Sequence, residues 1–322
     1  MEKQFVKFLV KALILSLSLL FVISSVSADE IHGIFFSLNR NSAWPTLEQV
    51  VQKLNLFEMP DEEPWNMDIA SLSAYYDKIK PINRDLYTAA GRPPLDFSCY
   101  TSKTFPQIDD ISLYFVKFVR ALMLDYYYGL KKRNTSIAVK ALLSSFRIDS
   151  LVKNNPYIYC ALIRASNIYI MFQAFSKGVD ENLLNTFSDA DLANLILVIK
   201  SKKTEIKDGW RSAFEFESRI DNAILSKKLP FQKDTDLSDS DKENIIIRYK
   251  SVLRKISIGM LSDLDEPTLS EIQKESEKIN TYFISPVLTP VRWLQTYNQT
   301  IHQLNQMEHA FLQEADLRRK CK

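Results

Sequence analysis

Two charged side chains, Arg164 and Asp125, stand in otherwise apolar sequence. Arg164 is the only charged residue between Lys153 and Lys177. Asp125 lies between an apolar run and a triplet of tyrosines that begins at Tyr126. Because a charge buried among apolar side chains needs a partner, we expect Arg164 to pair with Asp125 or with another acid, and so to fix the register of neighbouring helices. The alternative is that Arg164, Asp125 and Tyr126 bind the carboxylate or phosphate of a ligand.

Metal ligation and disulfide bonding are the other chemistry that the sequence offers. His302 and His309 are seven residues apart and share one face of a predicted helix, but two ligands hold a metal only if other helices supply the rest. We expect a polar helix face there and assign no metal. Cys99 and Cys160 could form a disulfide in an oxidising compartment, with Cys321 free at the tail. Two buried thiols are the equally open alternative.

Motifs of the common catalytic and cofactor sites are absent from the sequence. The chain has no phosphate-binding glycine loop, no Cys-x-x-Cys, no His-Glu-x-x-His and no Gly-x-Ser-x-Gly. We therefore assign no catalytic residue and no cofactor. An enzyme with a dispersed site stays open, because carboxylates brought together by the fold leave no local motif.

Three consecutive helices are predicted within Ile108–Lys177, the most strongly patterned part of the chain. The first has apolar residues at steps of three and four, which places them on one face: Ile111, Tyr114, Phe115, Phe118, Val119, Leu122 and Tyr126. The second presents small residues, among them Ala138 and Ala141, which let neighbouring helices approach closely.

The third helix of this group is predicted to be the buried centre of the fold. Asn155 and Pro156 provide an N-cap followed by proline at the first helical position. The helix runs to Phe175 and ends near Gly178. It is apolar on nearly all sides, which is typical of a helix inside a larger body. Its length of about 20 residues also suits a membrane span, but the charge of Arg164 argues against a span.

The rest of the chain is helical by the same criteria, so the predicted fold class is all-α, an irregular bundle of about eight to ten helices around the buried central one. Only six glycines occur, and no strand-like alternation persists. The other predicted helices are Leu47–Glu58 with a Thr46/Gln49 capping box, a helix from Asp68 that Pro81 kinks or divides, Asp189–Lys202 capped by Ser188, Glu205–Leu225, Asp241–Leu261 with a Ser240/Glu243 box, a helix to Phe283 with a Thr268/Glu271 box, and Pro290–Arg319.

The N-terminal segment has the pattern of a signal peptide. Three lysines precede the uncharged, Leu- and Ile-rich run Ala12–Ser27. Small or short residues at its end predict cleavage between Ala28 and Asp29. The mature protein is therefore expected to be secreted or periplasmic. An uncleaved anchor is the alternative, and it is the only membrane contact that we expect.

Composition divides the chain into a signal peptide (1–28), a helical body (29–226), a charged link (227–241) and C-terminal helices (242–322) that pack on the body or form a subdomain. Cleavage removes three of 41 basic and one of 39 acidic side chains, which leaves 38 of each. A neutral chain has no overall attraction to nucleic acid or anionic lipid. Basic runs such as Lys131–Arg133 stand at predicted helix C-termini, where cations complement the helix dipole.

One stretch of the chain resembles a group of uncharacterised secreted bacterial helical proteins. The similarity covers about Trp65–Lys202 and lies in Ala141–Leu143, Leu151–Val152, Asn155–Pro156 and Ala161–Ala165. That group likewise has a signal peptide, a small-residue helix, an asparagine- or serine-proline start and a long apolar helix. The resemblance implies an extracytoplasmic helical fold and carries over no active-site residue. This chain is richer in Lys, Tyr and Phe than that pattern.

These features predict a non-enzymatic secreted or envelope protein that binds another protein. The contact surface is expected on the amphipathic helix Pro290–Arg319, and a large apolar patch there would favour this function. The alternative is a helical module that binds a small or lipid-like ligand between helices, which a closed apolar cavity near Arg164 and Tyr126 would favour. No nucleic-acid partner is expected.

Overall fold

The computed structural model describes residues 35, 37–58, 62–98, 109–222, 225, 237–260, 266–280 and 290–321. Within them the chain forms nine α-helices and no strand, which confirms the predicted all-α fold. The α-helices are α3 (Trp44–Asn55), α4 (Ile69–Ala89), α5 (Asp109–Lys131), α6 (Thr135–Ser150), α7 (Ile158–Asp180), α8 (Asp189–Glu217), α10 (Asp239–Gly259), α11 (Glu266–Asn280) and α12 (Pro290–Cys321). Two 3-10 helices are η1 (Pro64–Asn66) and η2 (Leu184–Thr186).

Some sequence predictions fall outside the described residues. They concern the signal peptide with Ala28 and Asp29 at its cleavage site, Cys99, and most of the link 227–241. Cys160, the other half of the suggested disulfide, is buried in α7 with its Sγ 3.5 Å from the backbone oxygen of Val152. Burial raises the pKa of its thiol to about 12. Signal cleavage, the disulfide and the link stay predictions.

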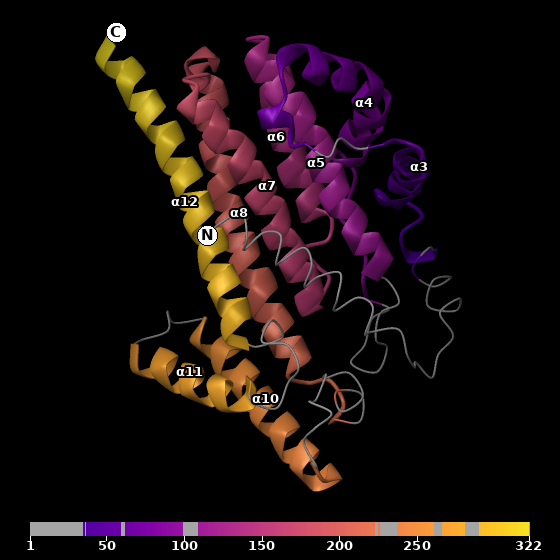
Figure 1. Ribbon diagram of the computed structural model, residues 1–322, viewed down its shortest axis with the longest axis vertical. Coiled ribbons are helices and arrows are strands. Elements are labelled where there is room, and N and C mark those ends of the chain that lie inside the picture. Colours follow the sequence, from indigo (N-terminus) through magenta and orange to yellow (C-terminus); the bar gives the residue numbers. More distant parts are fainter. Residues whose placement is uncertain are drawn as a thin grey trace.

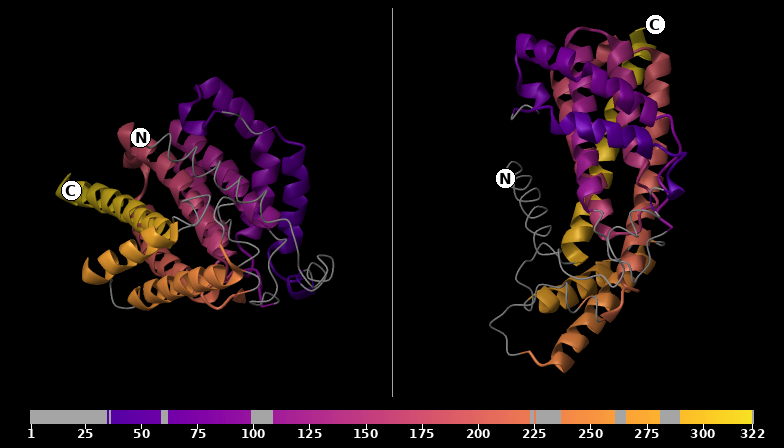
Figure 2. Two further views of the ribbon diagram at one scale, coloured as in Figure 1. Left: turned by 60° about the horizontal axis from the view of Figure 1, so that its bottom comes forward. Right: turned by 90° about the vertical axis from the view of Figure 1, so that its right-hand side faces the viewer.

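The long helices form a bundle with α7 near its centre (Figure 1). α7 packs on α5, α6, α8 and α12. α4 lies on α5 at one side with α3 against it, and α12 lies on α8 and α7 at the opposite side (Figures 1 and 2). α10 and α11 sit at one end of the bundle, where α10 packs on the end of α8 (Figure 1).

The apolar composition of α7 follows from this central position. Ile163, Ile168 and Met171 are fully buried, and Phe175 is nearly so. Of the described helices, α7 is the one long and apolar enough to cross a membrane, and 61% of its apolar window is buried inside the protein. A core helix has the same length and composition, and burial on several sides is what a core helix requires.

The small-residue face of α6 lets α5 approach closely, as its sequence predicts. Ala138 and Ala141 are fully buried against neighbouring helices. A Cβ added to Gly129 of α5 would lie 2.7 Å from the backbone nitrogen of Ala138. The two backbones are therefore in contact at a point where only glycine fits.

Several helix ends differ from those predicted. α7 begins at Ile158, because the side chain of Asn155 accepts a hydrogen bond from the backbone nitrogen of Tyr157 (3.1 Å) in the turn before the helix. Gly178 lies inside α7, and the turn after the helix has its left-handed residue at Asn182, with φ 53°.

The two helices predicted on either side of residues 203 and 204 are one continuous helix, α8. No glycine or proline interrupts the sequence there, and Lys202 contacts Glu205 across the expected break at 2.8 Å. Ser188 caps α8 as predicted, with Asp191 completing a capping box. The box at α10 uses Ser238 and Asp241 instead of the predicted Ser240 and Glu243, so that helix begins two residues early.

Two predicted capping boxes, at α3 and α11, are wrong, and Pro81, which was predicted to kink or divide its helix, does not divide it. α4 runs through Pro81 as a single helix. Its ring is exposed, so the carbonyl that loses its helical donor can bond to water. α3 begins at Trp44, before the expected Thr46/Gln49 box, and has no side-chain cap. The helix start at Glu266 likewise places Thr268 inside α11 and not at its cap.

Candidate functional site

Arg164 lies in a buried ionic network and not beside Asp125. Its Nε is 3.1 Å and its Nη2 3.0 Å from Oδ2 of Asp149, and its Nη2 also contacts Glu205. The predicted Arg164–Asp125 pair is therefore wrong, and the broader prediction of an acidic partner is right. The physical reason is orientation: Asp149 lies at the end of α6 that faces the first half of α7, whereas Asp125 turns from α5 toward α4.

Lys202 of α8 completes the network. Its Nζ donates to the backbone oxygen of Phe146 at 2.9 Å and to Oδ2 of Asp149 at 3.2 Å. It also contacts Oε1 of Glu205 at 2.8 Å and the hydroxyl of Ser150. Three helices, α6, α7 and α8, are thus joined by two cations and two carboxylates.

The charges in this network hold one another in the ionised state. Burial alone would raise the pKa of Asp149, but Arg164 and Lys202 hold it below its ordinary value. The pKa of Glu205 is lowered in the same way against the effect of its burial. Burial lowers the pKa of Lys202, and the adjacent carboxylate of Asp149 opposes that shift.

The contact of Ser150 with Lys202 places a hydroxyl beside an amine, the pair that some hydrolases use as nucleophile and base. The Nζ of Lys202 lies within hydrogen-bond distance of the backbone oxygen of Phe146 and of the carboxylates of Asp149 and Glu205, so its hydrogens have other acceptors and the amine is not free to take a proton from Ser150. Among the described residues, the cavity that Arg164 lines with Gly209 and Trp210 measures about 10 Å³, room for at most about one water. The network is therefore suited to fixing three helices and not to holding a substrate.

Sequence reasoning missed Asp149, Lys202 and Glu205. Asp149 follows Ser145 by four residues and precedes Val152 by three, so it falls on the small-residue face of α6. An acidic residue on a helix face that is predicted to be buried is the signal that could have identified Asp149. Lys202 and Glu205 carry no such signal, because a Lys and a Glu three residues apart are ordinary on an exposed helix face.

Asp125 is held by α4 instead. Its carboxylate accepts hydrogen bonds from Nδ2 of Asn83 at 2.7 Å and from the hydroxyl of Tyr87 at 2.6 Å. Burial raises the pKa of Asp125 to about 6, although both hydrogen bonds act in the opposite direction. Lys140 of α6 lies 4.3 Å from the centre of the Tyr87 ring.

Tyr126, the third predicted ligand-binding residue, is fully buried and points toward α7. Its hydroxyl would be 3.6 Å from a Cβ added to Gly178. No hydrogen-bond partner reaches this hydroxyl within the described part of the chain. Arg164, Asp125 and Tyr126 therefore occupy three separate environments and do not form one site.

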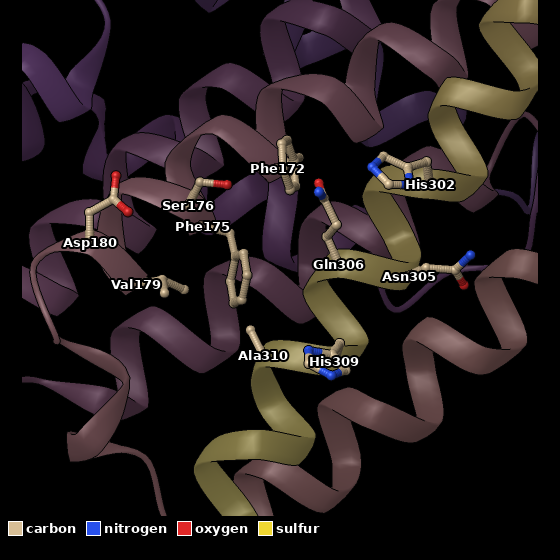
Figure 3. A pocket seen from close by; sticks show the side chains of 10 residues that line it. All are labelled: Phe172, Phe175, Ser176, Val179, Asp180, His302, Asn305, Gln306, His309 and Ala310. Atoms are coloured by element: carbon tan, nitrogen blue, oxygen red, sulfur yellow. The ribbon is translucent and has the colours of Figure 1, made fainter.

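A groove between α7 and α12 is much larger than the cavity at Arg164 (Figure 3). It has a volume of about 480 Å³ and is open to solvent on one side. Its lining residues are Phe172, Phe175, Ser176, Val179 and Asp180 from α7 and His302, Asn305, Gln306, His309 and Ala310 from α12. We call it the α7–α12 groove. Its base is apolar and its edges are polar.

The walls of the α7–α12 groove are fixed by contacts to the rest of the bundle. Nζ of Lys203 in α8 donates to Asn305 at 3.0 Å and pairs with Glu308, which ties the middle of α12 to α8. Aromatic packing sets the base, because the ring centroids of Phe175 and Phe311 are 4.9 Å apart. Lys203, Glu308 and Phe311, which do not line the groove, therefore position this half of α12 and two residues that do line it, Asn305 and Phe175.

The C-terminal end of α12 is fixed separately. The guanidinium of Arg318 donates to the backbone oxygens of Leu184, at 3.1 Å, and Phe187. Its Nε also pairs with Glu314 one turn earlier at 2.9 Å. These bonds satisfy carbonyls at the end of η2 and hold the last turns of α12 against it.

Both histidines of α12 line this groove, as their seven-residue spacing predicts for one helix face (Figure 3). His302 and His309 are exposed. Within the described residues, no group of three or more His, Cys, Asp and Glu side chains is arranged to hold a metal ion. The groove therefore offers apolar contact and hydrogen bonding as its chemistry.

Comparisons of this chain with models of known protein families, with curated proteins and with solved structures give no match.

Proposed function

We propose that this protein is a non-enzymatic helical protein of the secreted or envelope space that binds an amphipathic helical segment of another protein in the α7–α12 groove. The observation that carries the proposal is the groove itself, about 480 Å³ in volume, with an aromatic base and polar edges. The extracytoplasmic location rests on the signal peptide predicted for residues 1–28.

The shape of the groove favours a helical segment as its occupant. Two long helices form its walls, and an amphipathic helix binds in such a space by inserting apolar side chains one or two turns apart. Phe172 and Phe175 offer apolar contact, while Asn305 and Gln306 offer amide groups to the polar flank of the partner.

An exposed apolar residue, Leu317, continues this surface along α12. Leu317 is 59% exposed and follows Gln306 by eleven residues, about three helical turns, so it lies on the groove side of the helix. A partner helix that extends past the groove would cover it. Exposed apolar surface beside a groove is typical of protein-binding sites.

The alternative of a small or lipid-like ligand beside Arg164 and Tyr126 lacks the space that it requires. The cavity at Arg164 holds at most about one water, and Tyr126 packs against α7.

A selection experiment tests the proposal. A display library of amphipathic helical peptides is selected on the full protein and counter-selected on Val179→Glu, which puts a charge at the groove. Enriched peptides should bind the wild type and lose about tenfold or more in affinity on this variant, because a charge desolvated at an apolar contact is costly.

Leu197→Glu is the matched control, because Leu197 is 69% exposed on α8 and does not line the groove. It should bind the selected peptides like the wild type. Peptides that bind Val179→Glu as tightly as the wild type would show that the groove is not the binding site.

A further inference from the structure

A second surface, on α4, α5 and α6, carries lysines placed against tyrosine rings. Lys80 lies 5.8 Å from the centre of the Tyr76 ring, and Lys132 lies 5.9 Å from that of Tyr128. The rings of Tyr76 and Tyr128 stack on each other with their centroids 3.8 Å apart. Lys140 covers Tyr87 in the same way, as described above. We call these three lysines and three tyrosines the lysine–tyrosine face.

The six residues form one connected surface. Asp125 lies beneath it, bonded to Tyr87, and both Lys80 and Lys140 are near enough to lower the pKa of its carboxyl. α4 contributes Lys80 and Tyr87, the turn directly after α5 contributes Lys132, and α6 contributes Lys140. These helices lie on the side of the bundle away from α12 (Figure 1).

No ion pair within the described part of the chain neutralises the lysines of this face. Lys80, Lys132 and Lys140 are exposed, and within the described residues none of them forms an ion pair. Lys131, next to Lys132 in the sequence, is by contrast bonded to Glu181 at 2.6 Å. The sequence predicted a single role for the basic run Lys131–Arg133, at a helix C-terminus. In the structure Lys131 is paired with an acid and Lys132 is not.

Two further cations border the lysine–tyrosine face. Arg84 follows Lys80 by one turn of α4, and Arg133 lies in the turn after α5 in a left-handed conformation with φ 52°. Both are exposed and, within the described residues, neither forms an ion pair. The acids close to the face are Asp77, which is exposed, and the buried Asp125. Five exposed cations therefore lie on or beside this face, and of the two acids near Tyr76 only Asp77 is exposed.

The chemistry of the face selects among anionic partners. The faces of Tyr76 and Tyr128 are covered by each other and by lysines, so they are not free to stack on bases, as single-stranded nucleic-acid sites require. The central cations are lysines, which act as point charges and lack the bidentate fork that arginine uses for a single phosphate. Dispersed lysines with tyrosines at their base suit a broad layer of phosphates, such as lipid headgroups.

We infer that the lysine–tyrosine face binds the phosphate headgroups of an anionic lipid surface. The neutral charge of the whole chain gave no reason to expect this contact, which arises from local clustering. Each cation near such a surface contributes about fivefold to the partition coefficient. Loss of the three lysines should therefore weaken binding by about a hundredfold.

Vesicle co-sedimentation of the full chain tests this inference. We would measure the partition coefficient on phosphatidylcholine vesicles with and without phosphatidylglycerol and take the ratio of the two. Because all variants share the same N-terminal segment, any binding by that segment contributes equally to all of them. The triple variant Lys80→Ala/Lys132→Ala/Lys140→Ala should lose most of this ratio. The matched control Lys200→Ala/Lys274→Ala/Lys320→Ala, which removes the same charge from other helices, should change it by less than about fivefold.

Two further measurements make the test decisive. Circular dichroism verifies the fold of the triple variant, and if it is unfolded, Lys132→Gln alone should still lower the ratio by about fivefold. Binding by the wild type should fall steeply as salt rises from about 0.1 to about 1 M. An equal loss in both triple variants, or a ratio near one for the wild type, would overturn the inference. Binding to inorganic polyphosphate without binding to vesicles would reassign the face to a soluble polyanion.

Discussion

The Nη2 of Arg164 lies 3.0 Å from Oδ2 of Asp149, with both side chains almost completely buried. The pair joins α7 to α6 at the centre of the bundle, and Lys202 and Glu205 extend it to α8. Taking such charges out of water is costly, and their contribution becomes large when one partner is removed.

Removal of Arg164 should therefore destabilise the protein strongly. We expect Arg164→Ala to lower the free energy of unfolding by about 3–5 kcal/mol, because Asp149 would stay buried with its charge only partly compensated. Urea unfolding measures the effect. Arg219→Ala, which breaks an exposed pair with Glu215, should change stability by less than about 1 kcal/mol. A similar small loss for Arg164→Ala would contradict the assigned network.

Removal of the Tyr126 hydroxyl should be tolerated. The hydroxyl is fully buried and has no hydrogen-bond partner among the residues that the structure describes, and such a group costs about 1–3 kcal/mol to desolvate. Tyr126→Phe should therefore leave the stability unchanged or raise it by about 1 kcal/mol. Tyr87→Phe, which removes the donor to Asp125, should lower it. Thermal unfolding compares the two, and a clear loss of stability in Tyr126→Phe would reveal a partner for its hydroxyl.

The raised pKa of Asp125 makes one part of the stability depend on pH. Folding raises this pKa from its ordinary value near 3.9 to about 6, so the folded protein binds the proton more tightly than the unfolded chain does. The resulting stabilisation is fully present below about pH 4 and is lost as pH rises through about 6, by about 3 kcal/mol in all.

The variant Asp125→Asn isolates this effect, because it removes the titrating group and keeps the size of the side chain. Urea unfolding of both proteins between about pH 4 and pH 7 should show the wild type losing stability relative to the variant as pH rises. Asp149 and Glu205, whose pKa values are lowered, change stability in the opposite sense in both proteins. A constant difference across this range would contradict the raised pKa.

The close approach of α5 and α6 predicts a penalty at Gly129. Alanine favours a helix over glycine by about 1 kcal/mol, but here its Cβ would meet the backbone of Ala138 at 2.7 Å. We expect Gly129→Ala to destabilise by about 1–3 kcal/mol through overpacking. At Gly91, a Cβ would lie at an ordinary 3.5 Å from the backbone oxygen of Thr88, so Gly91→Ala should be tolerated. The denaturant midpoints of both variants measure these effects, and an unchanged midpoint for Gly129→Ala would contradict the close approach of the two helices.

Apolar periodicity predicted which segments are helical because burial decides that, as Phe115, Phe118 and Leu122 show on α5. Helix ends were predicted less well, since they depend on local hydrogen bonds that several residues can offer. Ser238 caps α10 although Ser240 stands two residues away with an acid at the same spacing. The continuity of α8 was also missed, although no glycine or proline interrupts the sequence at the predicted break and the i,i+3 pair of Lys202 and Glu205 spans it.

The candidate site could be predicted only in part. The spacing of His302 and His309 placed both on one face of a helix, and both line the α7–α12 groove. The sequence could not predict that Phe172 and Phe175 of α7 form the base of that groove, because this depends on which helices pack together. The partner of Arg164 was undecided for the same reason. Asp125 and Asp149 both lie in the three helices predicted within Ile108–Lys177, and only the orientation of α5 and α6 shows which of them meets Arg164.

The contacts that hold α12 in place also set an order of assembly. Lys203 meets Asn305 102 residues later, and Arg318 meets Leu184 134 residues earlier. Contacts between such distant residues form late, because the long intervening chain must be ordered first. Phe172 and Phe175 therefore stay uncovered on a growing chain until nearly all of it has been synthesised. The groove is complete only when the last helix docks. A chain truncated before Pro290 would therefore contain only the α7 wall of the groove.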